Sequence, residues 1–371
     1  MKIILVSPYS EHLVGGIINW TKYIVNYHRD NTNDVDLCLL NNEQAVGLYG
    51  TGYIFQRIRT GLSNYLPIYR NFKEIVKREH FDLVHISSSA SYGLLRDLLI
   101  VRYARKKGVK TAVHMHFGRI PQILKAKGWE RFLFISLLKR IDCAIVMDMS
   151  SYNALKEAGY DNVRYLPNPL STEVQQLIEK HKNVCREPRK IIFAGHVVRT
   201  KGVFELVEAC SGIKNIKLEL LGKVIEEGNI EQLFKLAGND AKSWLNIPGN
   251  KTLEDVIVEM KTCAVFALPT YSEGFPNVIL ESMACGCPIV TTLVGAIPEM
   301  LDINGSSPCG ICVEPKNVEA LKEAIIKLLE DNDYAQTISE RAVRRVNEYY
   351  AIEKVWVQLT EIWRFILSFK N

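Results

Sequence analysis

Two glutamates, Glu273 and Glu281, flank a stretch whose residues predict a loop followed by a short helix. Asn277 is a suitable N-cap, and residues 278–285 predict the helix. Paired carboxylates about 5–10 Å apart hydrolyse glycosidic bonds by acid/base chemistry, and these two could reach that separation. A helix N-terminus, however, presents N–H groups that favour a bound anion such as phosphate. The two acids could then hold sugar and ribose hydroxyls, or could merely suit the helix dipole.

The elements around this stretch must place it at the edge of a sheet. The apolar run 263–268 predicts a buried strand, which Pro269 ends. Gly286 suits the helix C-terminus, Pro288 prevents its continuation, and residues 288–290 predict the next strand. Strand, loop, helix and strand form one parallel crossover unit, which directs the helix N-terminus out of the carboxyl edge of the sheet.

A second loop with suitable chemistry follows a predicted strand at 190–194. It contains His196, Arg199 and Lys201 between Gly195 and Gly202. Lys201 stands where an ammonium could neutralise a diphosphate. The alternative is a surface lysine before a glycine turn.

The first half of the chain offers a glycine pair and a histidine pair. Gly15-Gly16 precede an amphipathic helix at 17–27, a pattern that suggests a phosphate or sugar near backbone N–H groups, although a tight turn alone also explains it. His114 and His116 end a predicted strand and share a face. No third residue has a spacing typical of zinc sites, so we favour one histidine at the strand end, facing a cleft.

Other motifs carry less chemistry. The lone Cys309-Gly310-Ile311-Cys312 and the pair at 285–287 are interpreted as inert thiols. The triplets at 34–36 and 331–333 look like the Asp-x-Asp metal motif of another sugar-transferase class. The first falls in a strand-like run and the second follows a helix, so we reject both and predict no metal and no cofactor.

Charge is concentrated in one region. The chain has a net charge of +5, but residues 96–140 contain twelve Lys and Arg against two acids. Within them, residues 119–140 interleave basic and apolar side chains. This suits either a helix on an anionic membrane surface or a core-facing helix with a basic rim. Nucleic acid is a weaker interpretation, because no recognised binding motif accompanies the charge.

Length and composition predict two globular domains, since 371 residues with 47% hydrophobic side chains can bury two cores. Nine scattered cysteines, several in apolar runs, indicate reduced thiols and a cytoplasmic location. The apolar start is too short for a signal peptide, and no run of about 18 apolar residues predicts a membrane span.

Strands and helices alternate along the chain, which predicts an α/β fold with two doubly wound domains facing each other across a cleft. Pro167-Asn168-Pro169 interrupts the alternation and predicts a boundary between domains 1–168 and 169–350. An aromatic-rich helix at about 351–371 is expected to pack back on the first domain. The predicted strands are 2–6, 35–40, 83–86, 110–114, 143–146, 163–166, 190–194, 217–221, 244–247, 264–268, 288–291 and 311–313.

Together these residues resemble the retaining glycosyltransferases of family 4, which have the GT-B fold of two Rossmann-like domains. The resemblance extends over nearly the whole chain, and its most specific part is the motif with seven residues between two glutamates. It rests on Gly15-Gly16, His116, Pro167-Asn168-Pro169, Gly195…Lys201-Gly202 and Glu273-Gly274-Phe275-Pro276-Asn277…Glu281. The family often has arginine where this chain has His196. Either a protonated His196 or Arg199 would then supply that phosphate contact.

The resemblance implies a nucleotide-sugar donor, most simply a UDP-sugar, bound mainly by the second domain. Lys201 would contact the diphosphate, Glu273 the donor sugar and Glu281 the ribose, while His116 would face the sugar from the first domain. Backbone groups of Gly274, Phe275, Asn277 and Val278 would meet phosphate and sugar, whereas Pro276 has no N–H to offer. The anomeric configuration would be kept, with the leaving phosphate taking the acceptor proton.

The biological role implied by the resemblance is transfer of a hexose or N-acetylhexosamine to a glycan or polyprenyl-diphosphate-linked glycan. Such transfer builds surface polysaccharides such as capsule or O-antigen. The enzyme would work in the cytoplasm, with 119–140 as a peripheral contact to the inner face of the plasma membrane. Two alternatives stay open: a nucleotide-sugar epimerase of the same architecture, and a non-catalytic nucleotide-sugar-binding subunit.

Overall fold

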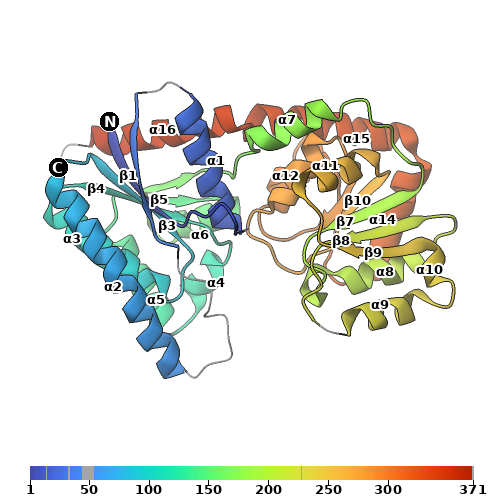
Figure 1. Cartoon of the computed structure of the whole chain (residues 1–371), viewed down its shortest axis with the longest axis horizontal. Helices are drawn as coiled ribbons and strands as arrows, with labels where there is room; N and C mark the ends of the chain where they lie inside the picture. Colours follow the sequence, from blue (N-terminus) through green and yellow to red (C-terminus); the bar gives the residue numbers. More distant parts are fainter. Residues whose placement is uncertain (14, 32–33, 44–53, 227, 370–371) are drawn as a thin grey trace. The chain divides into compact units, whose positions relative to one another are not determined.

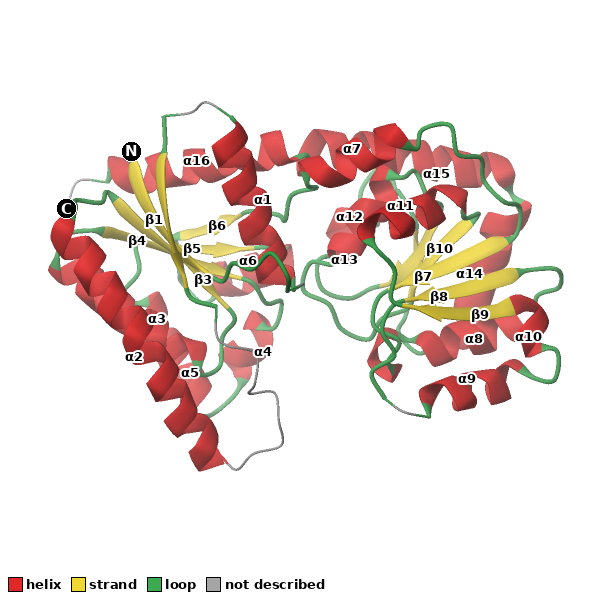
Figure 2. Cartoon of the chain, viewed as in Figure 1, coloured by secondary structure: helices red, strands yellow, loops and turns green. Residues whose placement is uncertain are grey.

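A computed structural model describes residues 1–13, 15–31, 34–43, 54–226 and 228–369. The chain forms two compact units (Figure 1). Unit 1 comprises Met1–Pro169 and Ile352–Asn371, and unit 2 comprises Leu170–Ala351. Each unit is a parallel six-stranded sheet with helices on its faces (Figure 2). The alternating α/β pattern predicted from the sequence is confirmed in both units.

Unit 1 has the strand order β2-β1-β3-β4-β5-β6. Its strands are rich in apolar residues because helices cover both faces of the sheet. The strands are β1 Lys2–Ser7, β2 Asp36–Asn41, β3 Leu83–Ser88, β4 Lys110–Met115, β5 Cys143–Val146 and β6 Val163–Tyr165. The helices are α1 Gly16–Asp30, α2 Ile54–Arg78, α3 Gly93–Lys106, α4 Ile120–Lys125, α5 Trp129–Leu138, α6 Met149–Glu157 and α16 Ile352–Ser368.

Helix α16 belongs to unit 1 although it ends the chain. Its apolar face packs with α1 and β1 in one buried cluster, in which Trp363 is fully buried. The indole Nε1 of Trp363 donates a hydrogen bond to Nδ1 of His85, at 3.0 Å. Arg364 reaches Asp34 at 3.0 Å. Most of the stability of such a helix comes from this packing rather than from helix propensity.

Unit 2 has the strand order β12-β11-β10-β7-β8-β9. Counted from β7, this is the Rossmann order 3-2-1-4-5-6. The strands are β7 Lys190–Ala194, β8 Lys217–Leu221, β9 Leu245–Gly249, β10 Val265–Leu268, β11 Ile289–Thr292 and β12 Ile311–Val313. The helices are α7 Thr172–Lys180, α8 Val203–Ser211, α9 Asn229–Ala237, α10 Ala241–Trp244, α11 Leu253–Thr262, α12 Asn277–Ala284, α13 Ile297–Met300, α14 Val318–Glu330 and α15 Asn332–Arg345, with turns η1 Arg199–Lys201 and η2 Val346–Tyr350.

Each sheet has a point where successive crossovers turn to opposite sides. In unit 1 this point lies between β1 and β3, and in unit 2 between β7 and β10. Ligands of such sheets bind beyond the carboxyl ends of the strands at this point. The strand order therefore selects the loops after β1, β3, β7 and β10 as the places to search for a site.

The twelve predicted strands are all present, with ends that differ by no more than two residues. The predicted helix at 119–140 is different, because α4 and α5 are separate helices with residues 126–128 between them. Gly128, at φ +143°, ends the connection in a backbone conformation that a continuous helix excludes.

Candidate functional site

The lysine loop, residues 195–202, leaves β7 at the switch point of unit 2. It ends in the 3₁₀ turn η1, and Gly202 follows at φ +72° before α8 begins. A Cβ atom on Gly202 would lie 1.9 Å from the carbonyl oxygen of Pro269. Gly202 is thus a glycine both because of its backbone conformation and because the next loop touches it.

The carboxylate loop, residues 269–276, leaves β10 beside the lysine loop. The Tyr271 N–H donates to the Thr200 carbonyl at 2.9 Å, and the Ala296 N–H donates to the Gly274 carbonyl at 2.9 Å. A Cβ atom on Gly295 would lie 2.2 Å from the Glu273 carbonyl oxygen. Backbone contacts on both sides therefore fix the position of the carboxylate loop.

The two loops bring Lys201 and Glu273 together as an ion pair. The side chains are 28% and 14% exposed, so the pair is partly withdrawn from solvent and the attraction is stronger than at an open surface. The ammonium has three donors, so it can bind a phosphate while still donating to Glu273. The geometry suits an anion beside Lys201 and a hydroxyl-bearing group beside Glu273.

Helix α12 follows the carboxylate loop and begins one residue earlier than predicted. Pro276 is the N-cap, no side chain caps the helix, and Asn277 is its first residue. The prediction of Asn277 as N-cap was therefore wrong. Pro276 takes an extended conformation that leads into the helix, and Phe275 anchors the turn by packing against the Tyr350 ring at 5.8 Å. Gly274 joins the loop to this turn, and Val278 lies in the first turn of α12.

Glu281 lies in α12, one turn after Asn277. No hydrogen bond or ion pair joins its carboxyl to another residue in the described part of the chain. Burial raises the pKa of Glu281 to about 7. A half-buried carboxyl with no partner among the described residues is available to a ligand with hydroxyl donors.

His196 and Arg199 are exposed parts of the lysine loop. The Arg199 guanidinium lies 3.9 Å from the centre of the Phe204 ring, in a cation–π contact. Within the described ranges, neither side chain is hydrogen-bonded to Lys201 or Glu273. Both residues thus lie in the lysine loop, but neither contacts the Lys201–Glu273 pair among the described residues.

In unit 1, Gly15 and Gly16 lead into α1 at the switch point. Gly15 is extended, with φ −178°, a conformation open to any residue. A Cβ atom on Gly16 would meet nothing within 4 Å, and one on Gly15 would meet only the Ile18 side chain at 3.9 Å. The turn itself does not require these glycines, which leaves room for a ligand to approach the backbone.

The two histidines of β4 share a face, as predicted, and their ring centroids are 3.9 Å apart. His114 is fully buried, while His116 lies one residue beyond the strand and is half-buried. Of the two, His116 is the less buried. Its Nε2 is enclosed by protein, so the ring is less open to a cleft than the sequence predicted.

Two residues that the sequence did not single out complete this histidine cluster. Trp20 of α1 stacks on His85 of β3 at 5.5 Å and meets the edges of His114 and His116 at 4.9 and 5.0 Å. Burial lowers the pKa of His85 and His116 to about 3, so both rings are neutral. The sequence contained one signal of this cluster, namely His85, a histidine inside the apolar run that forms β3.

Metal ligation has no support in the described ranges, where no three His, Cys, Asp or Glu side chains are placed to hold an ion. The first acidic triplet forms ion pairs, Asp34 with Arg364 and Asp36 with Lys2. In the second, Asp331 caps α15. Metal independence stays a prediction.

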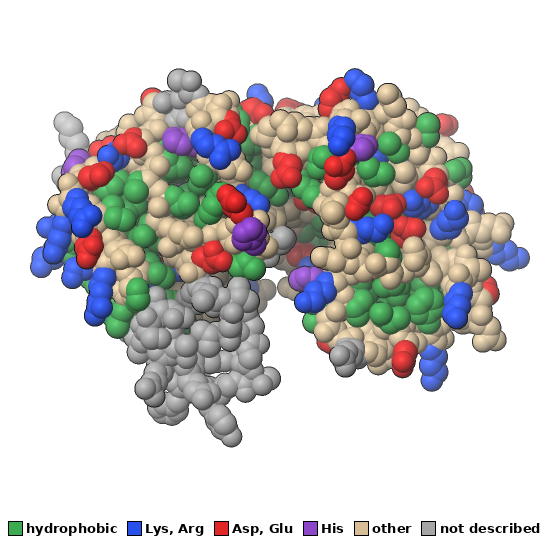
Figure 3. Space-filling model, viewed as in Figure 1, with side chains coloured by type: hydrophobic (Ala, Val, Ile, Leu, Met, Phe, Trp, Pro, Cys, Tyr) green, Lys and Arg blue, Asp and Glu red, His purple; other side chains and the backbone are tan. Residues whose placement is uncertain are grey.

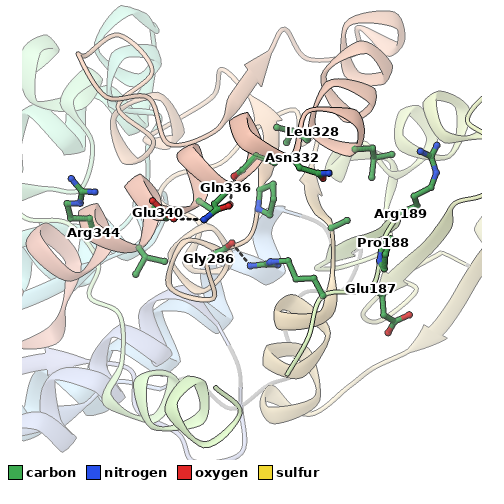
Figure 4. A pocket seen from close by; sticks show the side chains of 16 residues that line it. Glu187, Pro188, Arg189, Gly286, Leu328, Asn332, Gln336, Glu340 and Arg344 are labelled. Atoms are coloured by element: carbon green, nitrogen blue, oxygen red, sulfur yellow. Dashed lines mark hydrogen bonds between the residues drawn. The ribbon is translucent and has the colours of Figure 1, made fainter. Parts of the chain in front are cut away.

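A cavity of about 970 Å³ opens at the opposite edge of the unit 2 sheet (Figure 4). Pro188, Ala264 and Pro288, which line it, directly or nearly precede β7, β10 and β11. Its lining includes none of Lys201, Glu273 and Glu281. The cavity is therefore separate from the loops at the carboxyl edge.

Models of known protein families match both halves of the chain. Residues 14–174 match the model described as "Glycosyltransferase Family 4". Residues 174–345 match the model described as "Glycosyl transferases group 1". The two matches meet near the boundary between the units and together span most of the chain.

Curated relatives and a solved structure agree with these matches. The chain is 30% identical over 198 residues to the capsular polysaccharide biosynthesis glycosyltransferase CapM of Staphylococcus aureus, which is 52% of this chain and 50% of that one. It is 27% identical over 200 residues to the N,N'-diacetylbacillosaminyl-diphospho-undecaprenol α-1,3-N-acetylgalactosaminyltransferase of Campylobacter jejuni, covering 53% and 50%. These two matches span about half the length of each relative.

The fold is shared with HepE of Anabaena, solved in complex with UDP. The TM-score is 0.70 at 14% identity, covering 98% of this chain and 100% of that one. With the strand orders of the two units, this shows the GT-B architecture of two Rossmann-like domains. The chain belongs to the glycosyltransferases of the family 4 type.

Proposed function

We propose that the chain transfers a hexose or N-acetylhexosamine from a UDP-sugar to a glycan or polyprenyl-diphosphate-linked glycan, with retention of the anomeric configuration. One observation carries the proposal. The Lys201–Glu273 ion pair lies at the switch point of unit 2. It is followed directly by a helix that bears Glu281, whose carboxyl has no partner among the described residues. This sequence of cation, carboxylate, helix N-terminus and second carboxylate matches the parts of a nucleotide-sugar.

Each part of the donor then has a partner of suitable chemistry. Lys201 and the first turn of α12 neutralise the diphosphate. Glu273 accepts hydrogen bonds from the transferred sugar, and Glu281 from the ribose. Glu273 is already paired with a cation, which favours hydrogen bonding over nucleophilic attack. The bond from the anomeric carbon to the phosphate oxygen breaks, the bond to the acceptor oxygen forms on the same face, and the leaving phosphate takes the acceptor proton.

The relatives support the choice of donor and acceptor. The Staphylococcus relative is named for capsule synthesis, and the Campylobacter relative for transfer to a diphospho-undecaprenol-linked sugar. The structure of similar fold holds UDP. On this basis we assign surface polysaccharide synthesis as the role, with UDP-sugars as the first donors to test.

The proposal is tested with a panel of UDP-, GDP- and ADP-sugars and polyprenyl-diphosphate-linked acceptors. The expected result is transfer from a UDP-sugar, with a product whose anomeric configuration, read by NMR, equals that of the donor. Inversion would refute the retaining mechanism. Conversion of the sugar without an acceptor would support an epimerase, and binding without any turnover would support a non-catalytic subunit.

A second part of the proposal concerns an anionic membrane surface at α4 and α5 of unit 1. Most apolar side chains of 119–140 face the core, including Ile120, Ile123 and Phe134, so the core-facing alternative explains them. Trp129 and Phe132 do not, since they are 50% and 72% exposed. Exposed basic side chains stand close to them in the sequence, namely Lys125, Lys127 and Arg131. Exposed aromatics close to basic residues suit the interface of an anionic bilayer.

No described helix is long and apolar enough to cross a membrane. On the face shown in Figure 3, basic and acidic side chains intermingle over both units rather than forming one basic stripe. From the exposed Trp129 and Phe132 we propose peripheral contact with the inner face of the plasma membrane. Since the sequence has no recognised nucleic-acid-binding motif, we propose no nucleic acid as a partner. On this proposal the enzyme works in the cytoplasm.

Vesicle sedimentation tests the membrane contact. The wild type should sediment with phosphatidylglycerol vesicles at low salt, and Trp129→Ser/Phe132→Ser should lose most of this binding. Ile230→Ser/Leu236→Ser, which removes two exposed apolar side chains of unit 2, serves as the matched control and should sediment normally. Equal sedimentation of all three proteins would refute the proposed surface.

A further inference from the structure

Tyr271 connects three elements of unit 2 through its side chain. Its hydroxyl donates to Oε1 of Glu205 in the first turn of α8, at 2.5 Å. The Lys316 ammonium, from the connection between β12 and α14, lies 4.8 Å from the centre of its ring. We call Glu205, Tyr271 and Lys316 the tyrosine brace.

The brace is connected to both members of the ion pair through the backbone. The Tyr271 N–H donates at 2.9 Å to the carbonyl of Thr200, the residue before Lys201. Tyr271 itself is two residues before Glu273. The backbone bond to Thr200 does not depend on the tyrosine hydroxyl, so fixing the Tyr271 ring limits mainly where the Glu273 carboxylate can stand relative to Lys201.

The brace is costly to build, which argues against an incidental contact. Lys316 has φ +66°, a left-handed conformation that is unfavourable for a lysine. The second carboxyl oxygen of Glu205, Oε2, is buried with no partner among the described residues. Burial and the neighbouring Glu205 raise the pKa of Tyr271 to about 12, so its hydroxyl stays a donor across the working pH range.

We propose that Tyr271, held by Glu205 and Lys316, is a positioning residue that sets Glu273 against the transferred sugar. The inference rests on the proposed function and deepens it, since it assigns a determinant of sugar placement outside the residues that touch the donor. Tyr271 acts through Glu273, whereas the nucleotide is held by Lys201 and Glu281. The brace should therefore affect the sugar and leave UDP affinity nearly unchanged.

Tyr271→Phe tests the inference, because it removes the hydroxyl and keeps both the ring and the backbone N–H. We expect kcat for transfer to fall roughly tenfold, since a small misplacement of a catalytic group is costly. The Kd for UDP, measured by calorimetry, should stay within about twofold, whereas the preference for UDP-sugar over UDP should shrink by a similar factor to kcat. A purely structural role would lower both affinities together with the melting temperature.

Variants of Glu205 supply the matched comparison. Glu205→Gln keeps a carbonyl acceptor for the tyrosine hydroxyl and should retain most activity, whereas Glu205→Leu should resemble Tyr271→Phe. The double variant Tyr271→Phe/Glu205→Leu should be no worse than either single one, because both remove the same hydrogen bond. Tyr334→Phe, which changes another ring beneath a lysine, Lys327, should behave as wild type.

The outcomes separate this inference from the proposed function. Suppose that the wild type binds UDP-sugars, but that its preference for UDP-sugar over UDP is no greater than that of Tyr271→Phe. This result would refute the positioning role of the brace and leave the proposed function standing. Wild-type kcat in Tyr271→Phe would do the same. A wild type that neither binds nor turns over any nucleotide-sugar would overturn the proposed function, and the brace with it.

Discussion

The loops at the two switch points differ in the charge of their side chains and in the role of their glycines. In unit 2, charged side chains meet, Lys201 with Glu273, and backbone contact forces the glycines that frame them, as at Gly202 and Gly295. In unit 1, the rings of His114 and His116 are neutral, and no contact forces Gly15 or Gly16. The difference is that the loops of unit 2 hold charged side chains at fixed positions, whereas the loops of unit 1 hold neutral rings and glycines that no described contact requires.

The largest expected effect is that of Glu273→Gln, which removes the negative charge but keeps the shape. We expect kcat to fall about 100-fold, because the amide accepts more weakly from the sugar and leaves Lys201 unpaired. UDP affinity should change by less than about threefold. Glu254→Gln, which breaks an exposed pair with Lys180, is the control and should change neither value. An equal loss of UDP affinity would assign Glu273 to the nucleotide instead.

Lys201→Ala tests the other member of the ion pair in unit 2, the cation. UDP affinity should weaken about 30-fold, equivalent to about 2 kcal/mol for lost charge-assisted hydrogen bonds, and turnover should fall with it. Calorimetry with UDP gives the value, with Lys180→Ala as an exposed-lysine control. If both variants bind UDP as the wild type does, Lys201 has no role at the diphosphate and the contrast between the units disappears.

A pair of glycine substitutions tests the contrast directly. Gly202→Ala should lower stability by about 2 kcal/mol or more, because its φ is +72° and its Cβ would strike the Pro269 carbonyl. Gly16 is the first residue of α1, and a Cβ atom there would meet nothing within 4 Å. Gly16→Ala should therefore leave the stability unchanged or raise it by up to about 1 kcal/mol. Gly16→Ala should nevertheless lower turnover if the donor approaches that backbone. Urea unfolding and transfer assays separate the two effects.

The last expected effect is a pH dependence of stability that comes from Glu281. Burial raises its pKa in the folded chain from 4.5 to about 7, so the folded chain holds this proton more tightly than the unfolded chain. Stability from this group is therefore present below about pH 4.5, falls as the pH rises towards 7, and is lost above it. Glu281→Gln should match the wild type at pH 4.5 and exceed it by about 1–3 kcal/mol at pH 8. A constant difference at both values would contradict the shift.

Local sequence predicted the secondary structure of both units well, because strand and helix periodicity depends on residues a few positions apart. It predicted less well where one residue changes the local geometry. Pro276 displaced the expected N-cap, and Gly128 divided the expected helix at 119–140 into α4 and α5. In that region the sequence also left membrane and core alternatives open; most apolar side chains there are buried in the core, whereas Trp129 and Phe132 are exposed.

The sequence alone determined which residues could hold a nucleotide-sugar, since Lys201, Glu273 and Glu281 stand in short motifs after apolar runs. Only the tertiary structure decided which of them meet. Lys201 pairs with Glu273 across 72 positions because β7 and β10 are neighbours in the sheet, and Trp363 bonds to His85 across 278 positions because α16 packs on unit 1. The brace at Tyr271 likewise joins α8 to the end of β10. Such contacts depend on strand order and helix packing, which arise from burial of the whole core and leave no short-range pattern in the chain.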